Sequence, residues 1–155
     1  MLTNVDVRLF ILVWMLWFGS EILLNRKFRS SDADQKGQDK GSIRVLWIGL
    51  LGGNALAVLA SMFFTSSTLR ISSNPQIAYA GLVVTVIGML FRFYAVWSLG
   101  RNFTVDVTIR EDHKLHTQGV YGLIRHPSYT GMIISFIGFG ISMNTWPGLI
   151  AVCVF

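Results

Sequence analysis

Long apolar segments alternate with shorter polar ones along the chain. Crossing a bilayer takes about 20 apolar residues in a helix, and four segments approach or exceed that length: residues 7–24, 43–64, 77–97 and 131–155. In lipid, each backbone N–H and C=O group needs a partner within its own segment, so the segments are predicted to be helices rather than strands. The pattern predicts an all-α membrane protein, with residues 1–155 forming one multi-pass helical bundle.

The fourth apolar segment is interrupted by the polar and helix-breaking residues 144–147. The apolar piece before them, residues 131–143, would make a helix of about 20 Å, which is short of the roughly 30 Å hydrocarbon core. A helical hairpin that turns at residues 144–147 therefore fits better than one straight span. We expect three spans followed by a C-terminal helical hairpin. The chain stops at Phe155 inside an apolar run with no polar flank, as expected of a truncated protein.

Small residues recur every four positions in the second segment, at Gly49, Gly53 and Ala57. This spacing places them on one helical face and lets another helix approach closely, so we expect helix packing there rather than a ligand groove. The residues before the third segment, 72–75, have the composition of a turn.

Two ionisable side chains lie within the predicted spans. Glu21 is near the end of the first span, about one turn from Arg26, and is expected to extend toward the membrane surface. Arg92 lies in the third span, where an arginine is energetically costly and suggests a functional site. It is also only about two turns from the end of its span, so it too could extend to the interface. Its position alone leaves both interpretations open.

Charge is scarce and unevenly distributed. Charged residues make up 14% of the chain, against about a quarter in a soluble domain. The net charge of +5 comes from basic residues after the first and third spans, whereas the loop after the second holds only Arg70. The positive-inside rule then places the N-terminus outside and residues 25–42 and 98–130 in the cytosol. Nucleic-acid binding is not needed to explain the basicity, and the single Cys153 excludes a disulfide framework.

All three histidines lie in the polar loop 98–130. His113 and His116 are spaced so that both rings could share one helix face and bind a metal. No cysteine is near, however, and Gly119 and Gly122 interrupt the stretch that follows. We therefore predict no metal site.

The end of this loop has the features of a ligand site. His126 precedes Pro127 and is a predicted N-cap for a helix that begins at the proline. The start of a helix offers free N–H groups and partial positive charge to an anion, and Arg125 adds a planar cation beside it. Tyr121 and Tyr129 supply flat surfaces. The alternative is an ordinary interfacial belt, because tyrosine and arginine are common at helix ends in membranes.

These residues resemble a family signature. Gly119-Val-Tyr121, followed by Arg125-His126-Pro127-Ser128-Tyr129-Thr-Gly131, is similar to the motif of the isoprenylcysteine carboxyl methyltransferases, a group that includes phospholipid-methyltransferase-like relatives. The resemblance extends upstream through His113-Lys-Leu-His116 and Asn102-Phe103-Thr104 to Arg92, and covers roughly residues 85–145.

The resemblance implies methylation that depends on S-adenosyl-L-methionine at the cytosolic membrane face. It implies that Arg92 orients the carboxylate of a lipid-linked or prenylated substrate, and we expect Arg125 to join it as a catalytic residue. The implied cofactor-binding residues are His113, Lys114, Leu115, His116, Tyr121, His126, Pro127, Ser128 and Tyr129. A carboxylate acceptor is already ionised at neutral pH and needs no general base. An amine acceptor would need one, and His116 or His126 are then the candidates.

Two other functions remain open. Membrane sterol reductases carry a similar motif with asparagine where this chain has Ser128, but NADPH would call for more cationic groups than Lys114 and Arg125 provide. A non-catalytic scaffold is the other, because the family's segments beyond the hairpin do not appear in this sequence. We expect the bilayer of a prokaryotic plasma membrane, or of the endoplasmic reticulum in a eukaryote.

Overall fold

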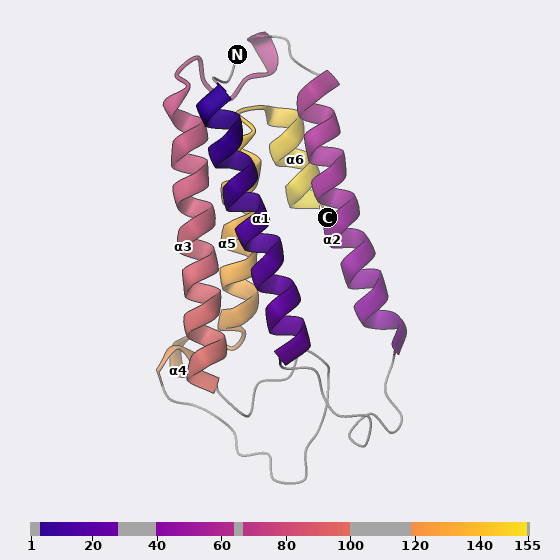
Figure 1. Cartoon of the computed structure of the whole chain (residues 1–155), viewed down its shortest axis with the longest axis vertical. Coiled ribbons are helices and arrows are strands. Elements are labelled where there is room, and N and C mark those ends of the chain that lie inside the picture. The colour runs from indigo at the N-terminus through magenta and orange to yellow at the C-terminus, as the bar shows by residue number, and fades with distance from the viewer. Residues whose placement is uncertain (1–3, 28–39, 64–66, 100–118, 155) are drawn as a thin grey trace.

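The protein is a bundle of long helices, seen in a computed structural model (Figure 1). The structure describes residues 4–27, 40–63, 67–99 and 119–154. The helices there are α1 (Asn4–Lys27), α2 (Lys40–Phe63), η1 (Ser67–Leu69), α3 (Gln76–Leu99), α4 (Val120–Leu123), α5 (Pro127–Ser142) and α6 (Trp146–Val154). Within these described ranges no strand occurs, which confirms the all-α prediction.

Among the residues that the structure describes, two helices are long and apolar enough to cross a membrane: residues Val7–Leu24 of α1 and the whole of α3, Gln76–Leu99. The apolar part of α2, Leu51–Phe63, is shorter than such a span. Large apolar side chains are exposed on the outer faces of these helices, including Leu23 at 67% and Leu90 at 59%. A surface of this kind needs an apolar partner such as lipid. The structure thus supports two of the three predicted spans by length and composition.

The closest helix pair is α3 with α5, which run antiparallel and in contact along the length of α5. Small residues face each other there, and we call the set the small-residue interface: Gly81, Thr85 and Gly88 of α3 with Gly131, Ser135, Gly138 and Ser142 of α5. A Cβ atom on Gly131 would lie 2.6 Å from the backbone nitrogen of Arg92. Cβ atoms on Gly88 and Gly138 would collide with the backbone of the opposite helix. The two helices therefore touch through their backbones.

Hydroxyl groups join the helices at this interface. Ser135 Oγ donates to the Thr85 carbonyl across the interface at 3.2 Å or to the Gly131 carbonyl of its own helix at 3.0 Å. Thr85 Oγ1 lies 3.0 Å from the Gly81 carbonyl and 3.4 Å from that of Ser135. Between apolar helices in lipid, close packing and hydrogen bonds of this kind supply the attraction that the hydrophobic effect cannot.

The predicted packing face of α2 is only partly confirmed. Ala57 is fully buried and belongs to the core cluster with Phe139 and Ala151, where α6 packs against α2. The prediction is wrong for Gly49, because nothing lies within 4 Å of where its Cβ would be. The physical reason is length: α6 has 9 residues and α2 has 24, so α6 covers only one end of α2 (Figure 1).

The predicted hairpin is present. Helix α5 ends at Ser142 and α6 begins at Trp146, and Asn144 between them has a left-handed backbone with φ of 51°. The Asn144 amide accepts a hydrogen bond from the Ser72 N–H at 3.1 Å and donates one to the Ser72 carbonyl at 3.0 Å. The turn predicted at residues 72–75 is also present, and Asn74 caps α3 by accepting the Gln76 N–H at 3.0 Å. The hairpin is thus tied to the start of α3.

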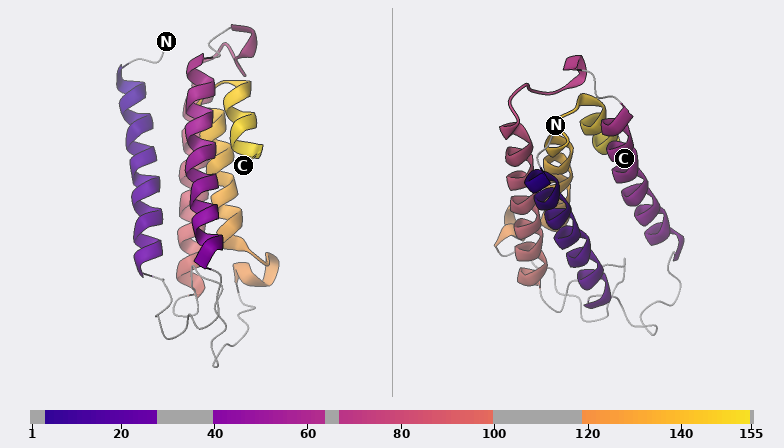
Figure 2. Two further views of the ribbon diagram at one scale, coloured as in Figure 1. Left: turned by 90° about the vertical axis from the view of Figure 1, so that its right-hand side faces the viewer. Right: turned by 45° about the horizontal axis from the view of Figure 1, so that its top comes forward.

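Helix α1 lies along one side of the bundle, as the first view of Figure 2 shows. Aromatic side chains attach it to α5: Trp14 contacts Phe139 with ring centroids 5.3 Å apart, and Trp17 contacts Phe136 at 5.2 Å. Closer to the C-terminal end of α1, Glu21 makes an ionic contact with α3.

Candidate functional site

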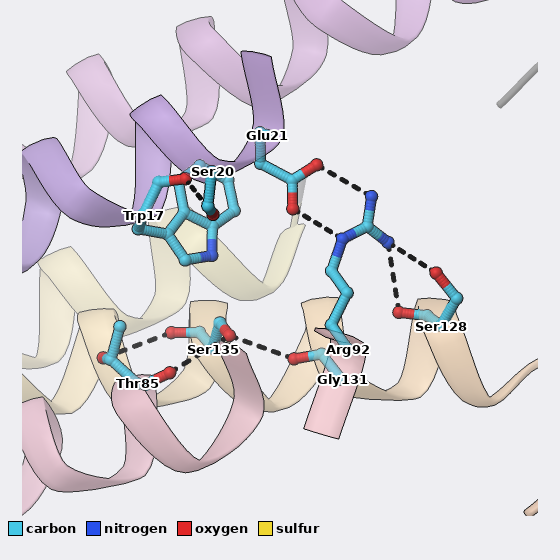
Figure 3. Close-up of polar contacts among 8 residues, drawn as sticks. All are labelled: Trp17, Ser20, Glu21, Thr85, Arg92, Ser128, Gly131 and Ser135. Atoms are coloured by element: carbon cyan, nitrogen blue, oxygen red, sulfur yellow. Dashed lines mark hydrogen bonds and ion pairs between the residues drawn. The ribbon is translucent and has the colours of Figure 1, made fainter. Parts of the chain in front are cut away.

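Arg92 lies inside the bundle, where α1, α3 and α5 meet (Figure 3). Arg92 is only 9% exposed, so its side chain does not extend to the membrane surface. Its Nη1 donates to the carbonyl of Ser128 at 3.2 Å and to the Ser128 hydroxyl at 2.9 Å. The glycine at position 131 lets α5 pass directly over the Arg92 backbone. Helix α3 thus places the Arg92 cation beside the first turn of α5.

Glu21 supplies the counter-charge, and the expectation that it extends to the membrane surface is wrong. The residue is 6% exposed, and its Oε2 accepts a hydrogen bond from Arg92 Nη2 at 2.7 Å. The second contact, Arg92 Nε to Glu21 Oε1 at 2.5 Å, is an ion pair rather than a well-aligned hydrogen bond. The physical reason is that burying either charge alone is costly, whereas a close pair offsets much of that cost.

The start of α5 has the geometry predicted from the sequence. His126 is the N-cap residue and Pro127 is the first helical residue. Proline brings no N–H group, and those of Ser128 and Tyr129 belong to the first turn, which a helix leaves without partners of its own. These N–H groups and the helix dipole make the turn suitable for an anionic group.

The side chains of this turn divide into two kinds. Pro127 and Ser128 are buried. Pro127 packs inside the bundle, and Ser128 accepts the hydrogen bonds from Arg92. His126 and Tyr129 are exposed, and their rings lie 5.9 Å apart between centroids. A flat ligand therefore has an aromatic surface available at His126 and Tyr129, but not at Pro127 or Ser128.

Tyr121 approaches the same region from α4, whose N-cap residue Gly119 has a φ of 59°. Its phenol donates to the Ala95 carbonyl of α3 at 3.2 Å. Burial raises the pKa of the Tyr121 phenol above its ordinary value, and the Arg92 charge partly opposes this shift. The phenol is therefore protonated at neutral pH and acts as a hydrogen-bond donor. The structure brings Tyr121, Arg92 and the first turn of α5 to one end of the bundle.

The remaining candidates are less informative. Arg125 is exposed beside the turn. His113, Lys114, Leu115 and His116 lie outside the described residues. Among the residues that the structure does describe, no three metal-binding side chains of the His, Cys, Asp and Glu types gather in one place.

The structure also has a cleft that the sequence did not predict. It has a volume of about 610 Å³ and is mostly apolar. It lies between α2 on one side and α5 and α6 on the other, and among its lining residues are Gly49, Gly53, Met132, Phe136 and Val152. Met132 and Phe136 are on the face of α5 that does not pack against α3. The small residues of α2 were the one signal for this cleft in the sequence.

Comparison with known proteins agrees with the motif. Residues 80–155 match the model of the isoprenylcysteine carboxyl methyltransferase (ICMT) family. The chain is 44% identical over 64 residues to a probable protein-S-isoprenylcysteine O-methyltransferase of Oryza sativa subsp. indica, covering 40% of this chain and 34% of the relative. It is 45% identical over 60 residues to protein-S-isoprenylcysteine O-methyltransferase B of Arabidopsis thaliana, covering 37% and 30%.

A mammalian relative gives the same picture. The protein-S-isoprenylcysteine O-methyltransferase of Rattus norvegicus is 39% identical over 61 residues, which is 38% of this chain and 22% of that protein. The chain thus spans about a third or less of the length of these curated relatives. No solved structure matches it. Residues 80–155, which include Arg92, Tyr121 and the turn into α5, are thus similar to the isoprenylcysteine carboxyl methyltransferase family.

Proposed function

We propose that this protein is a membrane methyltransferase that transfers a methyl group from S-adenosyl-L-methionine to the carboxylate of a lipid-linked, isoprenylcysteine-like acceptor. The observation that carries the proposal is the turn into α5. It lies within the family-matched segment, presents an exposed aromatic pair, and begins a helix over a buried cation.

This turn suits the methyl donor in charge and shape. The donor's amino-acid carboxylate would meet the N–H groups at the start of α5, with Arg125 beside them. Its adenine ring would lie against His126 and Tyr129, since aromatic side chains stack on flat rings. In this proposal His113, Lys114, Leu115 and His116 also contribute to donor binding, and Tyr121 of α4 supports the site through its bond to α3.

The reaction asks for positioning rather than for a catalytic base. The acceptor oxygen forms a bond to the methyl carbon as the bond from that carbon to sulfur breaks, and the sulfonium becomes a neutral thioether. A carboxylate with a pKa near 4 is already ionised, so no proton has to move. The protein's contribution is to hold oxygen, carbon and sulfur in line and to exclude water.

The apolar cleft between α2 and α5 would take the lipid chain of the acceptor. Ligand pockets are mostly apolar with a few polar groups, and their volumes are about 300–1,000 Å³, which includes that of this cleft. Met132 and Phe136 line it from α5, the same helix whose first turn would hold the methyl donor. One helix would then carry lipid chain and donor on different parts of its surface. We propose that this end of the bundle faces the cytosol, at a plasma or endoplasmic reticulum membrane.

A transfer assay tests the function. The chain is reconstituted in lipid nanodiscs with labelled S-adenosyl-L-methionine and an S-farnesylated N-acetylcysteine. We expect base-labile methyl ester to form, and none with the matched acceptor whose carboxylate is replaced by a carboxamide. Equal labelling of both acceptors would contradict carboxyl methylation, and labelling of neither would contradict the proposed activity.

A further inference from the structure

The buried ion pair extends the site beyond the family-matched segment. Glu21 lies in α1, outside residues 80–155, yet its carboxylate contacts Arg92, which donates to Ser128 at the start of α5. We propose that Glu21 is a positioning residue for the methyl-donor site, acting through Arg92 and Ser128 on the first turn of α5. The proposal rests on the proposed function.

The first step is the mutual dependence of the two charges. Their side chains are 11% and 8% exposed, so neither is solvated by bulk water. Removing one partner of a buried pair leaves the other as an uncompensated charge. Glu21 therefore determines whether Arg92 stays where it is.

The second step is the geometry of the guanidinium group. It is planar and rigid, with its donors in a fixed arrangement. The Nε and Nη2 side faces Glu21, while Nη1 donates to both oxygen acceptors of Ser128. Because the group is rigid, the contact with Glu21 also sets the direction of Nη1. Figure 3 shows this continuous series of contacts from α1 to α5.

The third step is what this leaves for a substrate. All three nitrogens of the Arg92 guanidinium already contact Glu21 or Ser128, which leaves no edge of the group free for a second carboxylate. An arginine that binds a substrate carboxylate ordinarily offers two parallel N–H groups. We therefore assign Arg92 to positioning together with Glu21, in place of the acceptor-binding role that the family resemblance implied.

The test measures donor binding, acceptor KM and thermal stability on the full chain in nanodiscs. The variants are Glu21→Gln and the neutral pair Glu21→Leu with Arg92→Met. Ile22→Ala, on the exposed side of α1, is the matched control. We expect both test variants to bind S-adenosyl-L-methionine about 10-fold or more weakly, with the acceptor KM nearly unchanged. The neutral pair should recover wild-type thermal stability without recovering donor affinity.

Two results would overturn the inference. One is wild-type donor affinity in Glu21→Gln together with a raised acceptor KM, which would return Arg92 to the acceptor. The other is donor affinity that recovers with thermal stability in the neutral pair, which would make the ion pair purely structural. A wild-type chain that binds no donor at all would instead overturn the proposed function.

Hydrogen exchange provides a readout that needs no ligand. The Thr130 amide in the first turn of α5, which donates to the His126 carbonyl at 3.0 Å, should exchange faster in the neutral pair than in the wild type, while amides near the α5–α6 turn stay unchanged. Equal exchange in the first turn would overturn the inference independently of any activity.

Discussion

Single polar side chains join parts of this protein that are far apart in the sequence. Asn144 holds Ser72 through both atoms of its amide, Tyr121 holds Ala95, and Arg92 links Glu21 to Ser128. The Asn144 and Arg92 contacts satisfy backbone groups of Ser72 and the buried charge of Glu21, whereas the Ala95 carbonyl also accepts from the Ser98 hydroxyl at 2.9 Å. Losing such a partner costs more than the bond itself contributes, so these residues should be sensitive to substitution.

Asn144 provides the first prediction at this scale. Asn144→Ala removes both hydrogen bonds to Ser72 and leaves a left-handed backbone that alanine tolerates poorly. We expect the free energy of unfolding to fall by about 1–3 kcal/mol, measured by denaturant titration in mixed micelles. Asn144→Gly keeps the backbone relaxed but loses the bonds, so it should fall between wild type and alanine. A glycine variant as stable as wild type would show that the amide bonds contribute nothing.

Tyr121 provides a prediction about pH. Its pKa is raised in the folded protein, so the folded state holds this proton more tightly than the unfolded state. The resulting stability is complete below the unfolded value of about 10 and is lost as pH rises through the higher folded pKa. Tyr121→Phe should lower stability by about 0.5–1.5 kcal/mol at neutral pH and flatten its decline above pH 10. A decline as steep as in the wild type would contradict this assignment.

The helix pair α3 and α5 is the rigid element of the molecule. The two helices contact each other through glycine, serine and threonine rather than through large apolar side chains. A larger side chain at the interface would therefore clash with the opposite helix. The same pair fixes Arg92 over Gly131. The rigidity of the small-residue interface therefore supports the geometry of the site.

A pair of glycine variants tests this interface. The new methyl group of Gly88→Ala would meet the Ser135 backbone, and we expect a loss of about 1–3 kcal/mol or more in unfolding free energy. Gly52→Ala is the control, because Gly52 is exposed on α2 with nothing within 4 Å. It should be neutral or stabilising by up to about 1 kcal/mol, from alanine's higher helix propensity. Equal effects would mean that the backbones are less tightly packed than described.

The elements were predictable wherever the signal was local. Apolar length predicted the helices, residues 144–147 predicted the hairpin, and the His126-Pro127 pair predicted the start of α5. The partner of Arg92 was not, because Glu21 lies 71 positions away and no local pattern joins them. The small-residue interface did have a signal, since Gly81, Thr85 and Gly88 recur at intervals of four and three. It was overshadowed by a similar pattern in α2 that mostly faces a cleft.

At the scale of the whole molecule, charge and chemistry occupy the same end. Arg26 and Lys27 end α1 there, and Arg125 precedes α5 at that end too (Figure 1), whereas Arg70 pairs with Thr145 beside the α5–α6 turn at the other end of α5. From the positive-inside rule we propose that the donor site faces the cytosol.

Cysteine labelling tests this orientation. The exposed Cys153 is first replaced by serine. In that background Ser73→Cys should react with a membrane-impermeant maleimide in intact cells. Lys27→Cys should react only after the membrane is permeabilised. The reverse pattern would place the proposed donor site outside the cytosol.

Equilibrium binding of labelled S-adenosyl-L-methionine to the purified chain tests the central claim most directly. The account predicts saturable binding that unlabelled S-adenosylhomocysteine displaces and NADPH does not. His126→Ala and Tyr129→Ala should each weaken it by about 10-fold, while the α2 control Gly52→Ala leaves it unchanged. No saturable binding, displacement by NADPH, or full affinity in both site variants would contradict a methyl-donor site at the start of α5.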